Sequence, residues 1–149
     1  MSISKKRTEP NQINAPESDY LYTAISKLSN SGNGLFTAID IYKDEIIAVF
    51  KGLVLTDQQA TLKAKKGEND YFMNLPNGKI LDCESIKGFA KYVNDARVGN
   101  LSGFKNKSKI TLDEHQNVCL VAISKIKAGE EIFCSYGKKY WAKHATPIL

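Results

Sequence analysis

A tyrosine at the end of a short apolar strand is the side chain of this sequence whose position best suits chemistry. Residues 123–141 predict the end of one strand, a turn at residues 127–129, and a second strand over residues 131–136 that stops before Gly137. Isoleucine and phenylalanine suit a half-buried pleated surface, and an Ala-Gly turn suits a hairpin. The hydroxyl of Tyr136 can donate or accept a hydrogen bond at that strand end. The alternative is an ordinary edge hairpin with a core tyrosine.

Two glycines around an asparagine form a second candidate for chemistry. Gly32, Asn33 and Gly34 follow a polar turn cluster and lead into Leu35 and Phe36. Glycine permits positive φ and lets another group approach the backbone closely. Most such triplets are hairpin turns. This one does not match a dinucleotide-binding fingerprint, because no helical pattern and no third glycine follow it.

The cysteines and histidines do not indicate a metal site. Cys83, Cys119 and Cys134 contain no Cys-x-x-Cys pair, and each lies among apolar or strand-forming neighbours. We therefore expect buried free thiols, with neither a disulfide framework nor a zinc site. The sequence contains only two histidines, His115 and His144, so we predict no metal site.

Composition predicts one soluble globular domain. The 149 residues are 42% hydrophobic and 25% charged, which is enough to bury a core without disulfides. No apolar run is long enough to span a bilayer, and the sequence starts without a hydrophobic secretory segment. We expect a cytoplasmic protein, or a nuclear one if its source has a nucleus, without a membrane partner.

The net charge of +5 is unevenly distributed. Residues 1–86 carry ten basic and eleven acidic side chains, whereas residues 87–149 carry eleven basic and five acidic ones. A basic half attracts nucleic acid or an anionic cofactor. The lysines are scattered, however, as solvated lysines commonly are, so nucleic acid is the less favoured partner.

The remaining pattern predicts a mostly-β domain of short strands, with turn signals about every ten residues. The polar residues 1–19 predict a flexible N-terminal arm. One longer helix is expected over residues 56–66, where Thr56 is the cap and Gly67 the stop, and residues 88–93 predict a short one. Residues 97–108 predict an exposed loop. Strands are expected over residues 20–28, 37–41, 46–50, 54–55, 71–75, 79–82, 109–112, 118–123 and 131–136, with an Asn-Gly turn at Asn77 and Gly78.

Four stretches, in order, resemble the SET domain family of S-adenosylmethionine-dependent protein-lysine methyltransferases. Residues 31–38 resemble the opening Gly-x-Gly-Leu-Phe-Ala motif. Tyr71 with residues 80–82 resembles the central tyrosine strand and its Ile-Asp pair. Residues 88–96 resemble Gly-Asn-x-Ala-Arg-Phe-x-Asn-His-Ser, and residues 122–137 resemble Ala-x-x-x-Ile-x-x-Gly-Glu-Glu-Leu-x-x-x-Tyr-Gly.

The resemblance covers residues 20–141 and implies a SET domain (β-clip). It implies several small curved sheets, few short helices and a C-terminal pseudoknot, in which a late segment passes near an earlier loop and brings Asn94 and Tyr136 together. Residues 142–149 would then form a C-terminal tail. Cysteine-rich zinc segments that often flank the family's domain are absent, so the chain looks like a minimal SET domain of the kind found in viruses and bacteria.

The resemblance also implies the roles of site residues. Tyr136 would be catalytic, positioning the sulfonium and the incoming amine, and Tyr71 would line the lysine channel or, alternatively, be a strand core residue. Backbone groups of four residues would wrap the methionine end of S-adenosylmethionine: Gly32, Asn33, Gly34 and Leu35.

Further cofactor contacts are implied for the third motif and the C-terminal aromatic residues. Asn94 would hold the cofactor through its amide, with help from the backbone of Asp95 and from Tyr136. Trp141 would stack on the adenine or cap the core. Asp95 stands where the family has histidine, and Lys91 where it has arginine. If only the backbone of residue 95 is used, aspartate is tolerable there.

Methyl transfer to lysine is an in-line displacement that needs a neutral amine, although a free lysine has a pKa of about 10.4. Burial and the adjacent sulfonium both disfavour the ammonium form, so proton loss to solvent could suffice without a dedicated base. Cys134 stands where the family often has phenylalanine or tyrosine. Its smaller side chain would leave room in the substrate channel for dimethyl or trimethyl products.

The predicted function is therefore methyl transfer from S-adenosylmethionine to the ε-amine of a lysine in a protein substrate, histone-like or another basic protein. The alternative is a catalytically inactive SET-like module that binds a peptide or nucleic acid through its basic C-terminal half. Acidic residues flank Tyr71 and suggest a groove for a basic peptide, or are solvated loop charges: Glu68, Asp70, Asp82 and Glu84.

Overall fold

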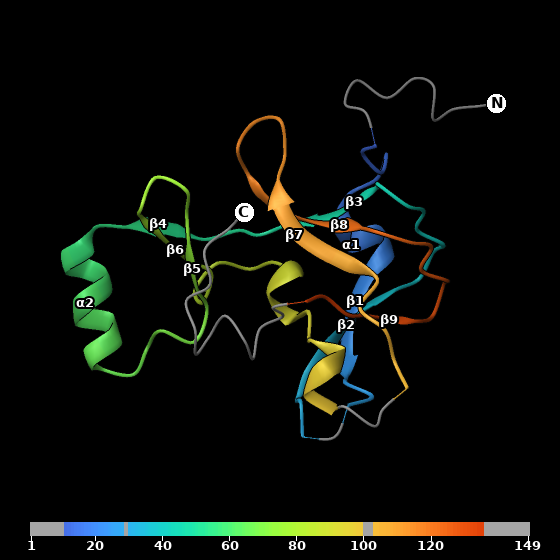
Figure 1. The fold of residues 1–149 in the computed structure, drawn as a ribbon, viewed down its shortest axis with the longest axis horizontal. Helices are drawn as coiled ribbons and strands as arrows, with labels where there is room; N and C mark the ends of the chain where they lie inside the picture. Colours follow the sequence, from blue (N-terminus) through green and yellow to red (C-terminus); the bar gives the residue numbers. More distant parts are fainter. Residues whose placement is uncertain (1–10, 29, 100–102, 136–149) are drawn as a thin grey trace.

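Small antiparallel sheets make up most of the regular secondary structure of the described residues (Figure 1). The computed structural model describes residues 11–28, 30–99 and 103–135. Within these ranges three sheets have the strand orders β1-β2-β9, β3-β8-β7 and β4-β6-β5. The strands are β1 (Leu21–Ile25), β2 (Asn33–Thr37), β3 (Ile46–Val49), β4 (Leu53–Leu55), β5 (Phe72–Asn74), β6 (Ile80–Asp82), β7 (Ser108–Leu112), β8 (Val118–Ala122) and β9 (Glu131–Ile132). The helices are α1 (Glu17–Tyr20), α2 (Asp57–Lys65) and the 3-10 turns Ala90–Tyr92 and Ala96–Gly99.

One apolar core joins the three sheets. Leu35 and Ile132 of the first sheet, Leu120 of the second and Met73 of the third are all fully buried in the same cluster. Because each sheet is too small to bury an apolar face alone, the sheets depend on this shared core. The mostly-β prediction with several small sheets and few short helices is confirmed.

The second strand starts earlier than the sequence predicts. A strand was expected over residues 37–41, whereas β2 runs from Asn33 to Thr37 and pairs with β1 and β9. The Thr37 hydroxyl accepts from the Ile39 amide at 3.1 Å and donates to the Ile39 carbonyl at 2.8 Å, which bends the chain out of the sheet. The glycine pair therefore belongs partly to a strand and not wholly to a turn.

Residues 11–20 are attached to β3. The carbonyl of Asn11 accepts from the Ile46 amide at 2.9 Å, and the Glu17 carboxylate accepts from the Val49 amide at 3.0 Å. The buried Tyr20 hydroxyl donates to the Ile47 carbonyl at 2.7 Å. Residues 11–19 thus carry structure where the sequence predicted a flexible arm. The predicted boundaries of the SET domain, at residues 20 and 141, and of the C-terminal tail, residues 142–149, stay predictions.

The helix and the hairpin with the strongest local signals form as predicted. Thr56 caps α2, because its hydroxyl accepts from the Gln59 amide at 3.1 Å while the Gln59 side chain accepts from the Thr56 amide at 2.9 Å. Gly67 and Gly78 take positive φ of 74° and 86° after the helix and in the β5–β6 turn. None of the residues of α2 is buried, and the helix lies at the edge of the molecule (Figure 1).

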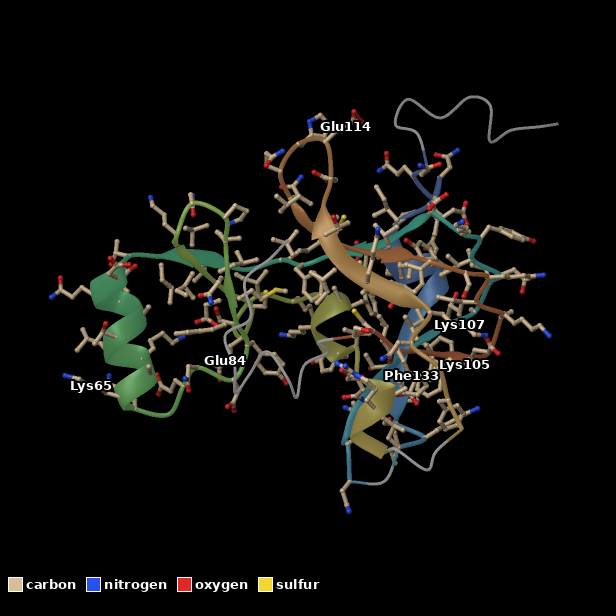
Figure 2. The ribbon with its side chains drawn as sticks, viewed as in Figure 1. Lys65, Glu84, Lys105, Lys107, Glu114 and Phe133 are labelled. Atoms are coloured by element: carbon tan, nitrogen blue, oxygen red, sulfur yellow. The ribbon has the colours of Figure 1, made fainter. Side chains whose placement is uncertain are left out.

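The C-terminal segment passes between the two ends of an earlier loop. The Cys134 amide donates to the Asn94 carbonyl at 2.9 Å, and the Phe133 carbonyl accepts from the Lys107 amide at 3.2 Å and the Ser108 hydroxyl at 2.7 Å. Lys107 and Phe133 lie close together in Figure 2. β9 ends at Ile132, short of the predicted residue 136, because the next residues pair with these two segments instead of β2. This arrangement is the predicted pseudoknot.

A search for membrane-spanning helices among the described residues finds none that is both long and apolar enough.

The buried cysteines should make the fold sensitive to alkaline pH. Burial raises the pKa of Cys83 and Cys134 to about 12 and that of Cys119 to about 11, from an ordinary 9.0. Above pH 9 the unfolded chain loses thiol protons that the folded chain keeps. Each such thiol therefore lowers the free energy of unfolding by up to about 1.4 kcal/mol per pH unit.

Urea denaturation at pH 7.5, 9 and 10 measures this loss. We expect the three thiols together to lower the stability by about 1 kcal/mol between pH 7.5 and pH 9, where half of each unfolded thiol is ionised, and more steeply from pH 9 to pH 10, before tyrosine ionisation contributes fully. A variant with all three cysteines replaced by alanine should show a flatter profile, although it starts from a lower stability. An equally steep decline in that variant would contradict the assignment to the thiols.

Candidate functional site

The side chain of Asn94 joins the glycine turn to the C-terminal segment. It is 1% exposed, and its Nδ2 donates to the Asn33 carbonyl at 3.2 Å and lies 3.5 Å from Oε2 of Glu131. Its backbone carbonyl accepts from the Cys134 amide. The structure thus brings together Asn33 and Asn94, two of the predicted cofactor-binding residues that are 61 positions apart in the chain.

The other amide atom of Asn94 lacks a partner. Within the part of the chain that the structure describes, Oδ1 of Asn94 is buried and accepts no hydrogen bond. A buried acceptor left unsatisfied costs about 1–3 kcal/mol. A ligand with N–H donors would remove that cost, so the atom is a candidate contact for a polar ligand.

Glu131 is a site residue that the sequence analysis did not single out. It is 7% exposed, its Oε1 accepts from the Lys27 amide at 2.7 Å, and its Oε2 accepts from the Ser26 hydroxyl at 2.7 Å. The Leu28 amide donates to the same hydroxyl at 3.1 Å, which leaves the serine proton for the carboxylate. The signal available in the sequence was the second glutamate of Gly-Glu-Glu, inside the stretch that resembles the fourth SET motif.

Glycine is required at the two positions of the turn for different physical reasons. A Cβ on Gly34 would overlap the Glu131 carboxylate, with 2.8 Å to its Cδ, and would lie 3.3 Å from Cβ of Ser26. Gly32 has room for a side chain but takes a φ of +62°. Glycine is therefore needed at 34 for close approach and at 32 for backbone conformation. The neighbouring Leu35 side chain is fully buried in the core, and its backbone lies in the central strand of the sheet, opposite Thr23 and Ile132.

Asp95 uses its carboxylate to hold the threaded loop. It accepts from Arg97 Nη2 at 2.8 Å, from the Arg97 amide at 2.9 Å and from Asn106 Nδ2 at 2.9 Å. Oδ1 of Asn106 accepts from the Ala96 amide at 2.8 Å, and its Nδ2 lies 3.5 Å from the Ser135 hydroxyl. The aspartate in place of the family histidine therefore links both ends of the loop around the C-terminal segment.

Lys91 holds Tyr71 from one side. Its ammonium lies 5.7 Å from the centre of the half-buried Tyr71 ring and 5.6 Å from that of Tyr92. Burial is the main cause that raises the pKa of Tyr71, and the nearby Tyr92 and acidic residues add to it. The same ammonium donates to three backbone carbonyls at 3.2, 3.0 and 3.1 Å: Cys83, Glu84 and Ile86.

Three of the four acidic residues expected near Tyr71 remain available to solvent. Glu68, Asp70 and Glu84 are exposed. Asp82 is instead 1% exposed and forms an ion pair with Lys63 of α2, so the expectation that it lines an open acidic groove is wrong. A carboxylate at this position fastens α2 to β6.

Of three further predicted site residues, Cys134, Tyr136 and Trp141, the structure describes the first. Cys134 is fully buried within the core, and its thiol donates to the Ser135 carbonyl at 3.0 Å. Tyr136 and Trp141 lie outside the described residues. The functional roles assigned to the predicted site residues stay predictions.

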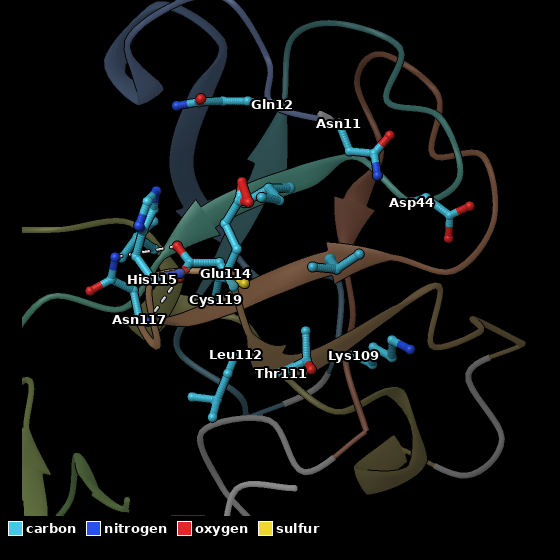
Figure 3. Close-up of a pocket in the computed structure, with 14 residues that line it drawn as sticks. Asn11, Gln12, Asp44, Lys109, Thr111, Leu112, Glu114, His115, Asn117 and Cys119 are labelled. Carbon is cyan, nitrogen blue, oxygen red and sulfur yellow. Dashed lines mark hydrogen bonds between the residues drawn. The ribbon is translucent and has the colours of Figure 1, made fainter. Parts of the chain in front are cut away.

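Two hollows lie on different parts of the surface. One of about 550 Å³ adjoins the glycine turn, with Ser26, Lys27, Gly32 and Asn33 in its lining. The other, of about 560 Å³, lies over β3, β8 and β7, and contains no predicted site residue (Figure 3). Its lining includes Asp44, Ile46, Lys109, Glu114, His115 and Val121. The first hollow is therefore linked to Asn94 through Asn33, which lines the hollow and whose carbonyl accepts from the Asn94 amide.

A mostly-β domain of small sheets, whose late segment passes between the ends of an earlier loop beside a glycine turn, is a SET-type fold. The model of the SET domain family matches residues 32–137, and the chain belongs to this family.

The relatives of the chain include a protein and solved structures from Chaetomium thermophilum. The chain is 31% identical over 126 residues to the histone-lysine N-methyltransferase EZH2 of Chaetomium thermophilum, which covers 77% of this chain and 8% of that protein. A structure of ctPRC2 in an autoinhibited conformation bound to S-adenosylmethionine matches with a TM-score of 0.62 and 26% identity, over 79% of this chain and 15% of that one. Chaetomium thermophilum Polycomb Repressive Complex 2 bound to GSK126 matches with 0.61 and 28%, over 78% and 16%. The chain thus spans a small part of these relatives' length.

Alanine substitutions of the two glycines should have unequal effects. Gly34→Ala forces apart a carboxylate that three donors hold in place, and we expect it to lower the free energy of unfolding by about 2 kcal/mol or more. Gly32→Ala, the matched control, meets no atom and incurs only the cost of left-handed backbone, about 1 kcal/mol. Urea denaturation of both variants tests this. Equal losses would contradict the close approach of Glu131 to Gly34.

Proposed function

We propose that the protein transfers methyl groups from S-adenosylmethionine to lysine side chains of a protein substrate. The observation that carries the proposal is the buried Asn94, whose Oδ1 is unsatisfied and whose Nδ2 contacts the Asn33 carbonyl of the glycine turn and the Glu131 carboxylate. Membership of the SET family and similarity to a protein named histone-lysine N-methyltransferase support it.

The residues at the turn suit S-adenosylmethionine. Its amino group carries N–H donors for Oδ1 of Asn94, and Gly32 and Asn33 line the hollow beside the turn, with the Asn33 carbonyl bound to the Asn94 amide. When bound, the cofactor supplies an electrophilic methyl group on a positively charged sulfur. A similar structure was determined with this cofactor bound.

The protein's own task is to position and desolvate the amine. We assign Tyr136 the positioning of the reacting groups, because a phenol with an ordinary pKa of about 10 can donate a hydrogen bond at neutral pH but is a poor base. Tyr71 would line the channel. Burial of the target amine favours its neutral, nucleophilic form.

A basic protein is the proposed substrate. Glu68, Asp70 and Glu84 are exposed around Tyr71 and would attract lysine and arginine residues next to the target. A histone would suit this charge, as the name of the relative suggests. Such a substrate would favour a nuclear location, whereas the expected cytoplasmic location suits another basic protein.

The second candidate is an inactive module that binds a peptide or nucleic acid, and Asp95 was the feature that favoured it. The contacts of Asp95 weaken that argument. Its carboxylate pairs with Arg97 and Asn106 and stabilises the loop without an imidazole. The substitution therefore has a structural compensation and does not by itself indicate loss of activity.

Two variants separate cofactor binding from catalysis. Asn94→Ala should weaken S-adenosylmethionine binding about ten-fold or more, because it removes the amide that the cofactor's amine would contact. Tyr136→Phe should keep most of the binding and lose about 100-fold or more in methyl transfer, since a phenyl ring cannot hydrogen-bond the reacting groups. Calorimetry and transfer of labelled methyl groups measure the two effects.

Asn117→Ala and Tyr42→Phe are the matched controls, because both residues are exposed and lie outside the turn. Neither should change binding or turnover. A wild-type protein that ignores S-adenosylmethionine but binds DNA with a steep salt dependence would support the inactive module instead.

Cys134 generates a prediction about the product. A small side chain there should permit dimethyl- and trimethyl-lysine on a good substrate. Cys134→Phe should shift the product towards monomethyl-lysine, at a cost of about 1–3 kcal/mol of stability because the site is fully buried. Mass spectrometry of long reactions measures the distribution, with Cys119→Ala as the control. Only monomethyl-lysine from the wild-type protein would contradict the idea.

A further inference from the structure

Three carboxylates are buried among the described residues, and one of them lacks a cation. Asp82 is paired with Lys63, and Asp95 is paired with Arg97. Glu131 is 7% exposed and forms no ion pair within the described part of the chain. Its sequence neighbour Glu130, half-buried at the surface, has Lys107 at 3.4 Å.

The hydrogen bonds of Glu131 all run towards its carboxylate oxygens. Each of its partners is a donor: the Lys27 amide, the Ser26 hydroxyl and, at 3.5 Å, Nδ2 of Asn94. The Ser26 oxygen already accepts from the Leu28 amide, so its proton points to the carboxylate. The carboxylate therefore acts only as an acceptor in these contacts.

A buried anion without a cation is unfavourable, and proteins rarely retain one without a partner. Here Nδ2 of Asn94 lies 3.5 Å from the unpaired carboxylate, and Oδ1 of the same amide is unsatisfied. A negative charge next to an orphaned acceptor matches a primary ammonium group, which brings one positive charge and three N–H donors. A sulfonium carries charge but no donor, and would leave Oδ1 unsatisfied.

We propose that Glu131 is the buried counter-charge for the ammonium group at the amino-acid end of S-adenosylmethionine. The inference rests on the proposed function and adds a binding residue to it. The target lysine is a poorer occupant, because a neighbouring anion would hold its amine protonated and so prevent attack. Glu131 thereby favours nucleosides that carry an amino acid over those that do not.

Three ligands distinguish this role from a merely structural one. S-adenosylmethionine and S-adenosylhomocysteine carry the ammonium group, whereas 5′-methylthioadenosine keeps the nucleoside and sulfur without the amino acid. In Glu131→Gln, which retains the shape and removes the charge, we expect both ammonium ligands to bind about ten- to hundred-fold more weakly. Binding of 5′-methylthioadenosine should change less than about two-fold, which also shows that the variant is folded.

Glu130→Gln is the matched control on the same turn and should leave all three affinities unchanged. The assignment is overturned if Glu131→Gln weakens the three ligands by the same factor, or weakens none of them, while the wild-type protein binds them. A wild-type protein that binds none of the three contradicts the proposed function itself, and the assignment fails with it. Competition calorimetry gives the constants for the weaker ligand.

Discussion

A single buried contact region around Asn94 and Glu131 is the constraint on which the site depends. Through it the glycine turn, the loop that follows the turn Ala90–Tyr92 and the last sheet strand meet, although Ser26 and Glu131 are 105 positions apart. The glycine turn has no such geometry by itself, because Gly34 is shaped by a carboxylate that arrives from the other end of the chain. The site therefore exists only in the complete fold.

The threaded segment makes this convergence cooperative. Its backbone at Cys134 bonds to Asn94, while Asp95 and Asn106 hold the surrounding loop, with Asn106 reaching Ser135. A displacement of the segment would thus disturb the cofactor side of the site and the loop together. The sequence change from histidine to aspartate is compatible with this arrangement, because Arg97 supplies the partner that the carboxylate needs when it is buried.

Local signals predicted the elements that local chemistry determines. The cap at Thr56 and the turn at Gly78 act within a few residues, so α2 and the β5–β6 hairpin could be placed from the sequence. The start of β2 could not be placed from the sequence. A glycine there indicates a turn, unless it is known that Glu131, far along the chain, packs against Gly34. Glu131 was missed for the same reason, since its partners are remote and a glutamate in a turn-strand pattern is ordinarily solvated. The order of motifs made Asn94 and Asn33 visible, and the structure shows that they touch.

The position of Lys91 has a consequence for a protein proposed to methylate lysines. Such a protein carries many lysines of its own, and each accessible one competes as an acceptor. The Lys91 ammonium is engaged by three carbonyl oxygens and lies near two aromatic rings, so all its N–H bonds are occupied. These contacts fix the side chain in place, because an ammonium group has three donors and each has a carbonyl partner here. Lys91, which stands where the family has arginine, is thus committed to structural contacts and is a poor acceptor for self-modification.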